Sequence, residues 1–354
     1  MRPDTDPPTV PGLGTTGNAL GSDGRGDRPV AGRPGPKATS KVDRGRDLAS
    51  RFGLLISLAV AVIGFSVALP DTFATQANFA AIVNSQALVL LLALAATIVL
   101  RTGDFDLSVA ATMTFTAAIA AVLTRDGDSL LLPVVIALAA GLLIGLINGI
   151  LVVRVGVNSF VATLGMMTAL GALAYAVTGS QVVFGIHGSI LSIVRDDFLG
   201  LPLLTWYSWA LVIVVWYVYE RTPLGRYLLF VGGSPESARL AGLPVDRLRI
   251  GAFVATATLS SIFGILLAGY LAGLDPSVGP SYLLPPFVGA FLGATTIAVG
   301  RFNAIGTVVA LYLLAVVITG LQLLGAASWV TDLFNGIALM IAVTLARLVS
   351  RKAA

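Results

Sequence analysis

From Phe52 onward the chain alternates long apolar stretches with short polar breaks. Each stretch has about the length needed to cross the roughly 30 Å hydrocarbon core of a bilayer as a helix. The predicted transmembrane helices are residues 52–70, 82–100, 107–124, 132–153, 160–178, 204–219, 250–272, 284–300, 304–324 and 331–347. The second and eighth stretches end in breaks rich in Gly and Thr, so a re-entrant or unwound course is their alternative. The pattern predicts an all-α polytopic membrane protein with about ten transmembrane helices.

Residues 1–50 follow a different pattern, with many prolines, glycines and scattered charges and no apolar period. Such a segment cannot bury enough apolar surface to offset the entropy lost on ordering it. We therefore expect a disordered cytoplasmic tail over residues 1–50 and a transmembrane domain over residues 51–354. The tail is not expected to be a signal peptide, because the first apolar stretch begins only near Phe52.

The basic residues predict the orientation of the helices. Lys and Arg side chains concentrate on the cytoplasmic side of membrane proteins. With the tail inside and an even number of crossings, all 22 Lys and Arg residues except Arg125 and Arg195 fall on the inside. The sequence therefore predicts a multi-pass protein of the inner or plasma membrane with both termini in the cytoplasm.

Composition limits the chemistry that the chain can perform. It is 56% hydrophobic and 11% charged, contains no Cys, and has one His, His187, in the outer segment 179–203. Thiolate metal sites and multi-His metal sites are therefore not expected, and His187 is interpreted as part of a solvated loop. There is no phosphate-binding G-x-x-x-x-G-K-[ST] motif. We expect no catalytic residue, metal or bound cofactor in this chain.

The inner loop 220–249 carries the signals of a short helix. Ser234 is a candidate N-cap, Pro235 stands at the first helical position, Glu236 suits the positive helix end, and Gly242 closes the segment. A helix of one or two turns is unstable alone in water, so we expect it to dock on a partner. The alternative is a simple tether between two membrane helices, although a tether needs no caps.

The same loop resembles that of a known family. Residues 222–226, Gly232-Gly233 and residues 238–245 resemble the cytoplasmic coupling loop of bacterial ABC-importer permeases of the ribose, xylose, arabinose and galactose type. The stretches 102–109, 145–149 with 158–165, and 289–325 resemble further motifs of that family, and the resemblance covers residues 52 to 349. Where the family motif has Gly-Gly before Ile-Asp-Leu-Ser, this chain has Thr102-Gly103 and an additional acid, Asp104.

The resemblance implies a sugar-importing permease that works with other chains. These are ABC ATPase subunits, which hold ATP and Mg, an extracytoplasmic sugar-binding protein, and a second permease that forms a homodimer or a related heterodimer. The binding protein is expected to land on segment 179–203 or near 273–283. By position in the motif, the residues implied to couple to the ATPase are Gly225, Arg226, Gly232, Gly233, Glu236, Ala238, Arg239 and Gly242.

Polar residues within or beside the apolar stretches are candidates for the translocation pathway. These are Asp104, Asp106, Ser108, Asn148, Asn158, Phe160, Thr163 and Thr295. A carboxylate at membrane depth is costly and normally has a reason. Asp106 either caps the helix that starts at Leu107 or accepts hydrogen bonds from sugar hydroxyls. Asp104 either accepts hydrogen bonds from sugar hydroxyls or lies at the inner interface beside Arg101. The Ser and Thr hydroxyls either line the pathway or bond their own backbone.

Two other readings of the chain remain open. A permease for nucleosides or branched-chain amino acids shares parts of the coupling loop. An ion-coupled secondary transporter normally keeps ionisable residues in mid-membrane, where only Asp104 and Asp106 qualify here. Separately, Gly141, Gly145 and Gly149 recur at four-residue spacing, which predicts close packing of their helix against a neighbour.

Overall fold

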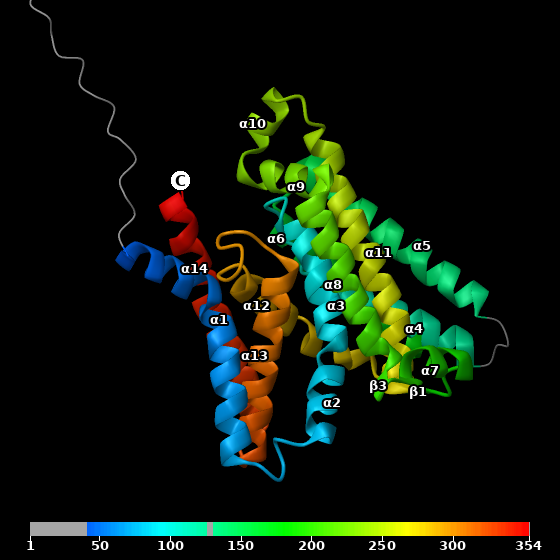
Figure 1. Cartoon of the computed structure of the whole chain (residues 1–354). Coiled ribbons are helices and arrows are strands. Elements are labelled where there is room, and N and C mark those ends of the chain that lie inside the picture. Colours follow the sequence, from blue (N-terminus) through cyan, green and yellow to red (C-terminus); the bar gives the residue numbers. More distant parts are fainter. Residues whose placement is uncertain (1–40, 126–129, 354) are drawn as a thin grey trace, which may run out of the picture.

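The computed structural model describes residues 41–125 and 130–353, which are mostly helical (Figure 1). The membrane-type helices are α1 (Lys41–Ala68), α2 (Gln76–Ser85), α3 (Ala87–Leu100), α4 (Val109–Arg125), α5 (Leu131–Ile150), α6 (Ser159–Thr178), α8 (Leu203–Arg221), α11 (Val245–Leu271), α12 (Leu284–Gly293), α13 (Ala304–Leu323) and α14 (Trp329–Ala353). The short helices are α7 (Gly188–Arg195), α9 (Pro223–Gly233) and α10 (Pro235–Leu240), with a π-helical turn η1 (Leu151–Val155) and a 3-10 helix η2 (Pro276–Tyr282). Helix α1 begins inside the segment that the sequence assigns to the tail, and residues 1–40 lie outside the described residues.

Six helical spans in the described part are long and apolar enough to cross a membrane. They are Gln76–Leu100, Leu131–Val155, Ser159–Thr178, Leu203–Arg221, Val245–Leu271 and Ala304–Leu323, and three shorter apolar helices cover Phe52–Ala68, Val109–Arg125 and Trp329–Leu345. The all-α membrane fold is therefore confirmed.

Every predicted stretch contains a helix, but the eighth, residues 284–300, does not form a full-length one. Helix α12 has 10 residues. At about 1.5 Å per residue it cannot cross a hydrocarbon core of about 30 Å. The chain turns back after Gly293, so the eighth stretch takes the re-entrant or unwound course, and the number of ten crossings stays a prediction.

Helix α3 runs through the middle of the bundle, and nearly all of its side chains are buried. Its sequence is apolar on every side, as expected for a helix surrounded by other helices. Next to it, the glycines of α5 face α11 as predicted. A Cβ added to Gly145 would lie 2.6 Å from the Cα of Val254, and one added to Gly149 would lie 3.1 Å from the Cα of Ile250. Backbones meet there because no side chain separates them.

The two ends of the bundle differ in structure. The start of α1 and the end of α14 lie at the same end as α9 and α10, whereas α7, β1 and β3 lie at the opposite end (Figure 1). At that opposite end β1 (Val183–Phe184) pairs antiparallel with β4 (Gly273–Leu274), and β2 (Asp197–Phe198) pairs with β3 (Leu201–Pro202). The two predicted outer segments, 179–203 and 273–283, are thereby joined into one surface.

Side chains cap the helices at this end of the bundle. His187 is half-buried and its Nδ1 accepts a hydrogen bond from the Ser189 N–H at 3.2 Å, so it caps α7 and is not simply part of a solvated loop. Asp275 caps η2, accepting from the Ser277 N–H at 2.8 Å and from the Ser277 hydroxyl at 2.7 Å. These hydrogen bonds to the charged form lower the pKa of the Asp275 carboxyl.

Two interruptions separate consecutive helices of the bundle. The first break, residues 101–108, separates α3 from α4, and the second break, residues 294–303, separates α12 from α13. In lipid every backbone polar group needs a partner, so broken helices are tolerated only where protein or water supplies one. The two breaks therefore need built-in hydrogen-bond partners.

Candidate functional site

The loop 220–249, which resembles the coupling loop of the family and is called the coupling loop below, is almost wholly helical. The predicted short helix is confirmed as α10, whose N-cap Ser234 accepts a hydrogen bond from the Ser237 N–H at 3.2 Å and whose first residue is Pro235. A second helix in the loop, α9, was not predicted. It begins with the same two signals, because Thr222 is its N-cap and Pro223 its first residue. Thr222 and Pro223 were therefore the sequence signals from which α9 could have been predicted.

The end of α10 is closed by a Schellman motif. The Gly242 N–H donates to the Arg239 carbonyl at 2.9 Å, the Leu243 N–H donates to the Ala238 carbonyl at 3.1 Å, and Gly242 has φ of +80°. A positive φ at this position favours glycine. Ala238 is buried against Val231, Leu243 and Val245, so α10 is packed onto its own loop.

The implied ATPase-coupling residues divide into two groups. Gly225 and Ala238 are buried and Gly232 is half-buried, whereas Arg226, Gly233, Glu236, Arg239 and Gly242 are exposed. A Cβ added to Gly225 would lie 2.5 Å from the Cα of Tyr219, so this glycine lets α9 pack against α8. Only the exposed group is available to a partner.

Leu240 was missed by the sequence reasoning. It is 92% exposed at the end of α10, two residues after the buried Ala238. Two residues on a helix lie about 200° apart, so Leu240 points away from the loop core. An apolar residue on the outer face of a capped helix was the signal that could have identified it.

The loop contacts the first break backbone to backbone. A Cβ added to Gly232 of α9 would collide with the Arg101 carbonyl oxygen and would lie 3.1 Å from the Gly103 nitrogen. Gly103 itself has φ of +84°, and its added Cβ would lie 3.3 Å from the Gly232 carbonyl oxygen. Both glycines are needed for the close approach.

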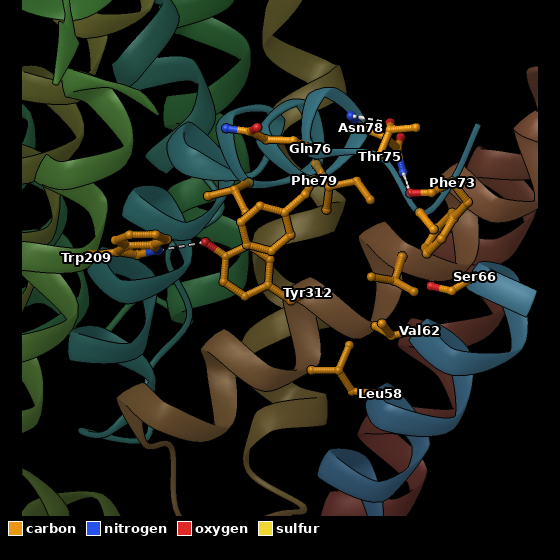
Figure 2. A pocket seen from close by; sticks show the side chains of 14 residues that line it. Leu58, Val62, Ser66, Phe73, Thr75, Gln76, Asn78, Phe79, Trp209 and Tyr312 are labelled. Carbon is orange, nitrogen blue, oxygen red and sulfur yellow. Dashed lines mark hydrogen bonds between the residues drawn. The ribbon is translucent and has the colours of Figure 1, made fainter. Parts of the chain in front are cut away.

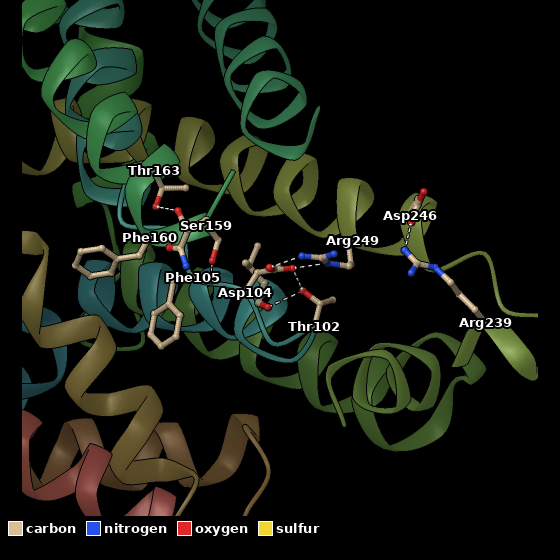
Figure 3. Close-up of polar contacts among 11 residues, drawn as sticks. Thr102, Asp104, Phe105, Ser159, Phe160, Thr163, Arg239, Asp246 and Arg249 are labelled. Carbon is tan, nitrogen blue, oxygen red and sulfur yellow. Dashed lines mark hydrogen bonds and ion pairs between the residues drawn. The ribbon is translucent and has the colours of Figure 1, made fainter. Parts of the chain in front are cut away.

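Asp104 forms an ion pair that neither sequence interpretation included (Figure 3). Its Oδ1 lies 2.7 Å from Arg249 Nη2 and its Oδ2 lies 2.8 Å from Arg249 Nε, with Arg249 near the start of α11. Arg101, the neighbour considered from the sequence, instead places its guanidinium 3.8 Å from the ring centre of Tyr219. Asp104 therefore links the first break to the coupling loop.

Asp106 lies in a buried polar cluster with Ser108 and Asn148. Its Oδ1 accepts hydrogen bonds from the Ser108 N–H at 2.9 Å and from the Ser108 hydroxyl at 2.5 Å. Asn148 Nδ2 donates to the same hydroxyl at 2.9 Å. Asp106 thus supports the start of α4, as in the capping interpretation. Asp106 Oδ2 and Asn148 Oδ1 are buried without a hydrogen-bond partner among the described residues.

Helix α6 supplies partners for the backbone of the first break. Thr163 Oγ1 accepts from the Leu107 N–H at 3.1 Å and donates to the Ser159 carbonyl at 2.7 Å. Ser159 Oγ accepts from the Phe105 N–H at 3.2 Å (Figure 3). Thr163 is thereby placed beside the Asp106 cluster.

The other predicted pathway residues do not join this cluster. Asn158 Oδ1 caps α6 by accepting from the Phe160 N–H at 3.0 Å, and the Phe160 ring is exposed beside it. Thr295 lies in the second break and donates to the carbonyl of Leu292 at 2.7 Å. Its hydroxyl therefore bonds the backbone, which was the alternative considered for these residues.

Aromatic rings connect the two breaks. The rings of Phe105 and Phe291 stack with centroids 5.9 Å apart, and Phe291 meets Phe302 edge to face at 5.3 Å. Phe105 belongs to the first break, Phe291 to the end of α12 and Phe302 to the second break. None of the three was singled out from the sequence.

Two cavities among the described residues are lined by side chains other than those of the polar cluster. An apolar groove of about 610 Å³ opens between α1, α2 and α13, with Trp209 Nε1 donating to the Tyr312 hydroxyl at 2.8 Å at one side (Figure 2). A second cavity of about 230 Å³ lies between α4, α6 and η2 and includes Thr114, Tyr175 and Ser277. Neither is lined by a predicted pathway residue.

Comparison with known proteins assigns the chain to a family. Residues 78–343 match the family described as the branched-chain amino acid transport system / permease component. The chain belongs to this family. It is a multi-pass membrane protein and a permease component, as predicted.

The relatives are import permeases. The ribose import permease of Escherichia coli strain K12 is 30% identical over 295 residues, covering 82% of this chain and 91% of the relative. The L-arabinose permease of Azospirillum brasilense is 28% identical over 89% of this chain and 94% of its own. The fructose import permease of Rhizobium meliloti is 30% identical over 85% and 86%. No solved structure matches the chain.

Proposed function

We propose that this chain is the membrane-spanning permease subunit of an ABC importer that carries a sugar across the inner membrane. The capped helix pair α9 and α10 carries the proposal, because it is exposed at one end of the bundle and packs on a helix break inside it. The names of the ribose, arabinose and fructose permeases support a pentose or hexose as the solute. The chain acts as a transporter subunit and not as an enzyme.

The end with α9 and α10 faces the cytoplasm. Arg221, Arg226, Arg239 and Arg247 are exposed there, which fits the retention of basic residues on the inner side. The start of α1 and the end of α14 share this side, which supports a cytoplasmic location for both of these helix ends (Figure 1).

Three kinds of partner complete the importer. ATPase subunits bind α9 and α10 and hold ATP and Mg. An extracytoplasmic sugar-binding protein lands on the opposite surface, where β1 pairs with β4 beside α7. A second permease, identical or related, completes the translocation pathway.

Branched-chain amino acids are the second candidate solute, and the description of the matching family favours them. Uptake decides between the two. Proteoliposomes containing the permease, its ATPase and its binding protein are expected to accumulate labelled ribose, arabinose or fructose but not labelled leucine when ATP is supplied. ATP-driven uptake of leucine alone would replace the sugar assignment. Uptake by this chain alone, driven by an ion gradient, would contradict the ABC importer.

Co-purification tests the docking role. Leu240→Asp places a charge on an exposed side chain, so we expect the variant to fold and insert but to lose the co-expressed ATPase. The matched control is Leu199→Asp, since Leu199 is 79% exposed at the opposite end. Arg239→Glu is a weaker test, because Arg239 lies 2.9 Å from Asp246 and the substitution places two carboxylates side by side, so it adds repulsion within the loop as well as changing the docking surface. Equal ATPase recovery with Leu240→Asp and Leu199→Asp would refute docking through α10.

A further inference from the structure

The coupling loop and the first break are joined at two places only a residue apart. We propose that the Asp104–Arg249 ion pair and the Gly103–Gly232 contact act as a positioning link, which transmits movement of α9 and α11 to the segment that carries Phe105. This inference rests on the proposed function. It assigns a role in coupling to Asp104 and Arg249, which lie outside the coupling-loop stretches that resemble the family.

The ion pair has the geometry of a rigid connection. Two nitrogens of one planar guanidinium meet both oxygens of one carboxylate, at 2.7 and 2.8 Å, which fixes orientation as well as distance. The side chains are only 7% exposed for Asp104 and 20% exposed for Arg249. Removing either partner leaves the other charge largely buried without compensation.

The contact between Gly103 and Gly232, next to the ion pair, is tightly packed. Backbone atoms of Gly103 and Gly232 meet directly, so no flexible side chain separates α9 from the break. A displacement of the loop is therefore passed to residues 103 and 104 through one backbone contact and one bidentate pair.

Phe105 is the next residue and cannot stay in place independently. Its N–H donates to Ser159 Oγ, and its ring stacks on Phe291. A shift at Asp104 therefore has to move Phe105 or strain these contacts. The link connects the ATPase-facing surface to the point where the two breaks meet.

A second ion pair on the same loop serves as an internal comparison. Arg239 and Asp246 meet at 2.9 Å, but their side chains are 55% and 36% exposed and neither contacts the break in Figure 3. Exposed pairs of this kind contribute little. Asp246→Asn is therefore the matched control, since it removes the same charge one turn of α11 away from Arg249.

The absence of cysteine from the chain allows a direct measurement. Phe160→Cys introduces a single thiol at an exposed position next to Ser159 and leaves the Ser159 hydroxyl to accept from the Phe105 N–H. The rate at which this thiol reacts with a small maleimide is measured in proteoliposomes of the full chain with its ATPase. The rate is compared without nucleotide and with ATP plus vanadate. We expect ATP to change the rate in the otherwise native chain and in the Asp246→Asn control.

Asp104→Asn and Arg249→Gln are expected to reduce that ATP-dependent change by about fivefold or more, although the ATPase still co-purifies and hydrolyses ATP. The double variant is expected to lose no more than either single one, because the two residues act as a unit. An undiminished response in Asp104→Asn, additive losses in the double variant, or an equal loss in Asp246→Asn would overturn the link. Failure of the native chain to retain the ATPase would instead overturn the proposed function.

Discussion

The two helix breaks solve the same problem in different ways. The first break takes most of its side-chain partners from elsewhere in the chain, namely Arg249 of α11, Ser159 and Thr163 of α6, and Asn148 of α5, while Asp106 bonds Ser108 within the break. The second break is closed by one of its own residues. The two hydrogens of Asn303 Nδ2 are shared among the carbonyls of Gly293 at 3.1 Å, Thr296 at 3.2 Å and Arg301 at 3.1 Å, and Asn303 Oδ1 accepts from the Gly306 N–H at 2.6 Å.

This difference separates a part that can be moved from a part that is fixed. A break held by side chains of neighbouring helices shifts when those helices shift. A break held by its own asparagine depends less on neighbouring helices, because one side chain of the segment bonds three carbonyls and the Gly306 N–H. We therefore expect changes in the second break to affect folding, and changes at the contacts of the first break to affect coupling.

The largest expected effect is on stability, in Asn303→Ala. Three carbonyls lose a buried donor and the Gly306 N–H loses its acceptor, so we expect a loss of at least about 3 kcal/mol. The thermal unfolding midpoint of the purified protein in detergent measures it. The control is Asn158→Ala, which removes an exposed helix cap and is expected to cost about 1 kcal/mol. Equal midpoints for the two variants would remove the special role of Asn303.

The next largest effect is expected at Gly232, and its neighbour Gly233 serves as the control for the contact with the first break. Gly232→Ala forces a methyl group against the Arg101 carbonyl, so we expect it to cost about 2 kcal/mol and to abolish ATP-driven sugar uptake while the ATPase stays bound. Gly233→Ala adds the same methyl group where nothing lies within 4 Å, so its unfolding midpoint should match that of the native chain. Normal uptake by the Gly232→Ala protein would show that the close contact with the break is dispensable.

A smaller effect is expected from Ser108→Ala in the polar cluster of the first break. Asp106 loses the hydrogen bond donated by the Ser108 hydroxyl, and Asn148 Nδ2 loses its acceptor, while the Ser108 N–H still donates to Asp106. We expect a cost of about 1–2 kcal/mol by thermal unfolding. Ser192→Ala on α7, whose hydroxyl bonds only the Ser189 carbonyl at 3.1 Å, is the control and should change stability by about 0.5 kcal/mol or less. A loss as large as that of Asn303→Ala would mean that both breaks depend equally on internal bonds.

Local signals in the sequence predicted the local features well. Ser234, Pro235 and Gly242 identified α10, and the four-residue glycine spacing identified the closely packed face of α5, although not its partner α11. Both depend on residues close together in the chain. The all-α membrane class followed from the apolar stretches for the same reason.

Features that join distant segments could not be predicted in this way. Asp104 and Arg249 are 145 residues apart, and no local pattern distinguishes a carboxylate that faces an arginine from one that faces a pathway. The pairing of β1 with β4 joins two outer segments whose strands are two residues long, too short for any period. The early end of α12 was visible only as a Gly- and Thr-rich break, because the hydrogen bonds of Asn303 that close it depend on the folded chain.

The smallest expected effect is the energetic coupling between the two breaks. Phe105 and Phe291 make a stacked aromatic pair across the gap between them, and such pairs contribute about 0.5–1.5 kcal/mol beyond their burial. A double-mutant cycle with Phe105→Leu and Phe291→Leu should give a coupling energy in that range from thermal unfolding. A parallel cycle with Phe198→Leu and Trp206→Leu, an aromatic pair whose ring centroids lie 5.5 Å apart at the end of the bundle with α7, provides the comparison.

If the first break is the movable one, the Phe105–Phe291 coupling energy should fall in complexes held with ATP and vanadate while the Phe198–Trp206 coupling energy stays constant. An unchanged Phe105–Phe291 value would mean that the two breaks move together or not at all.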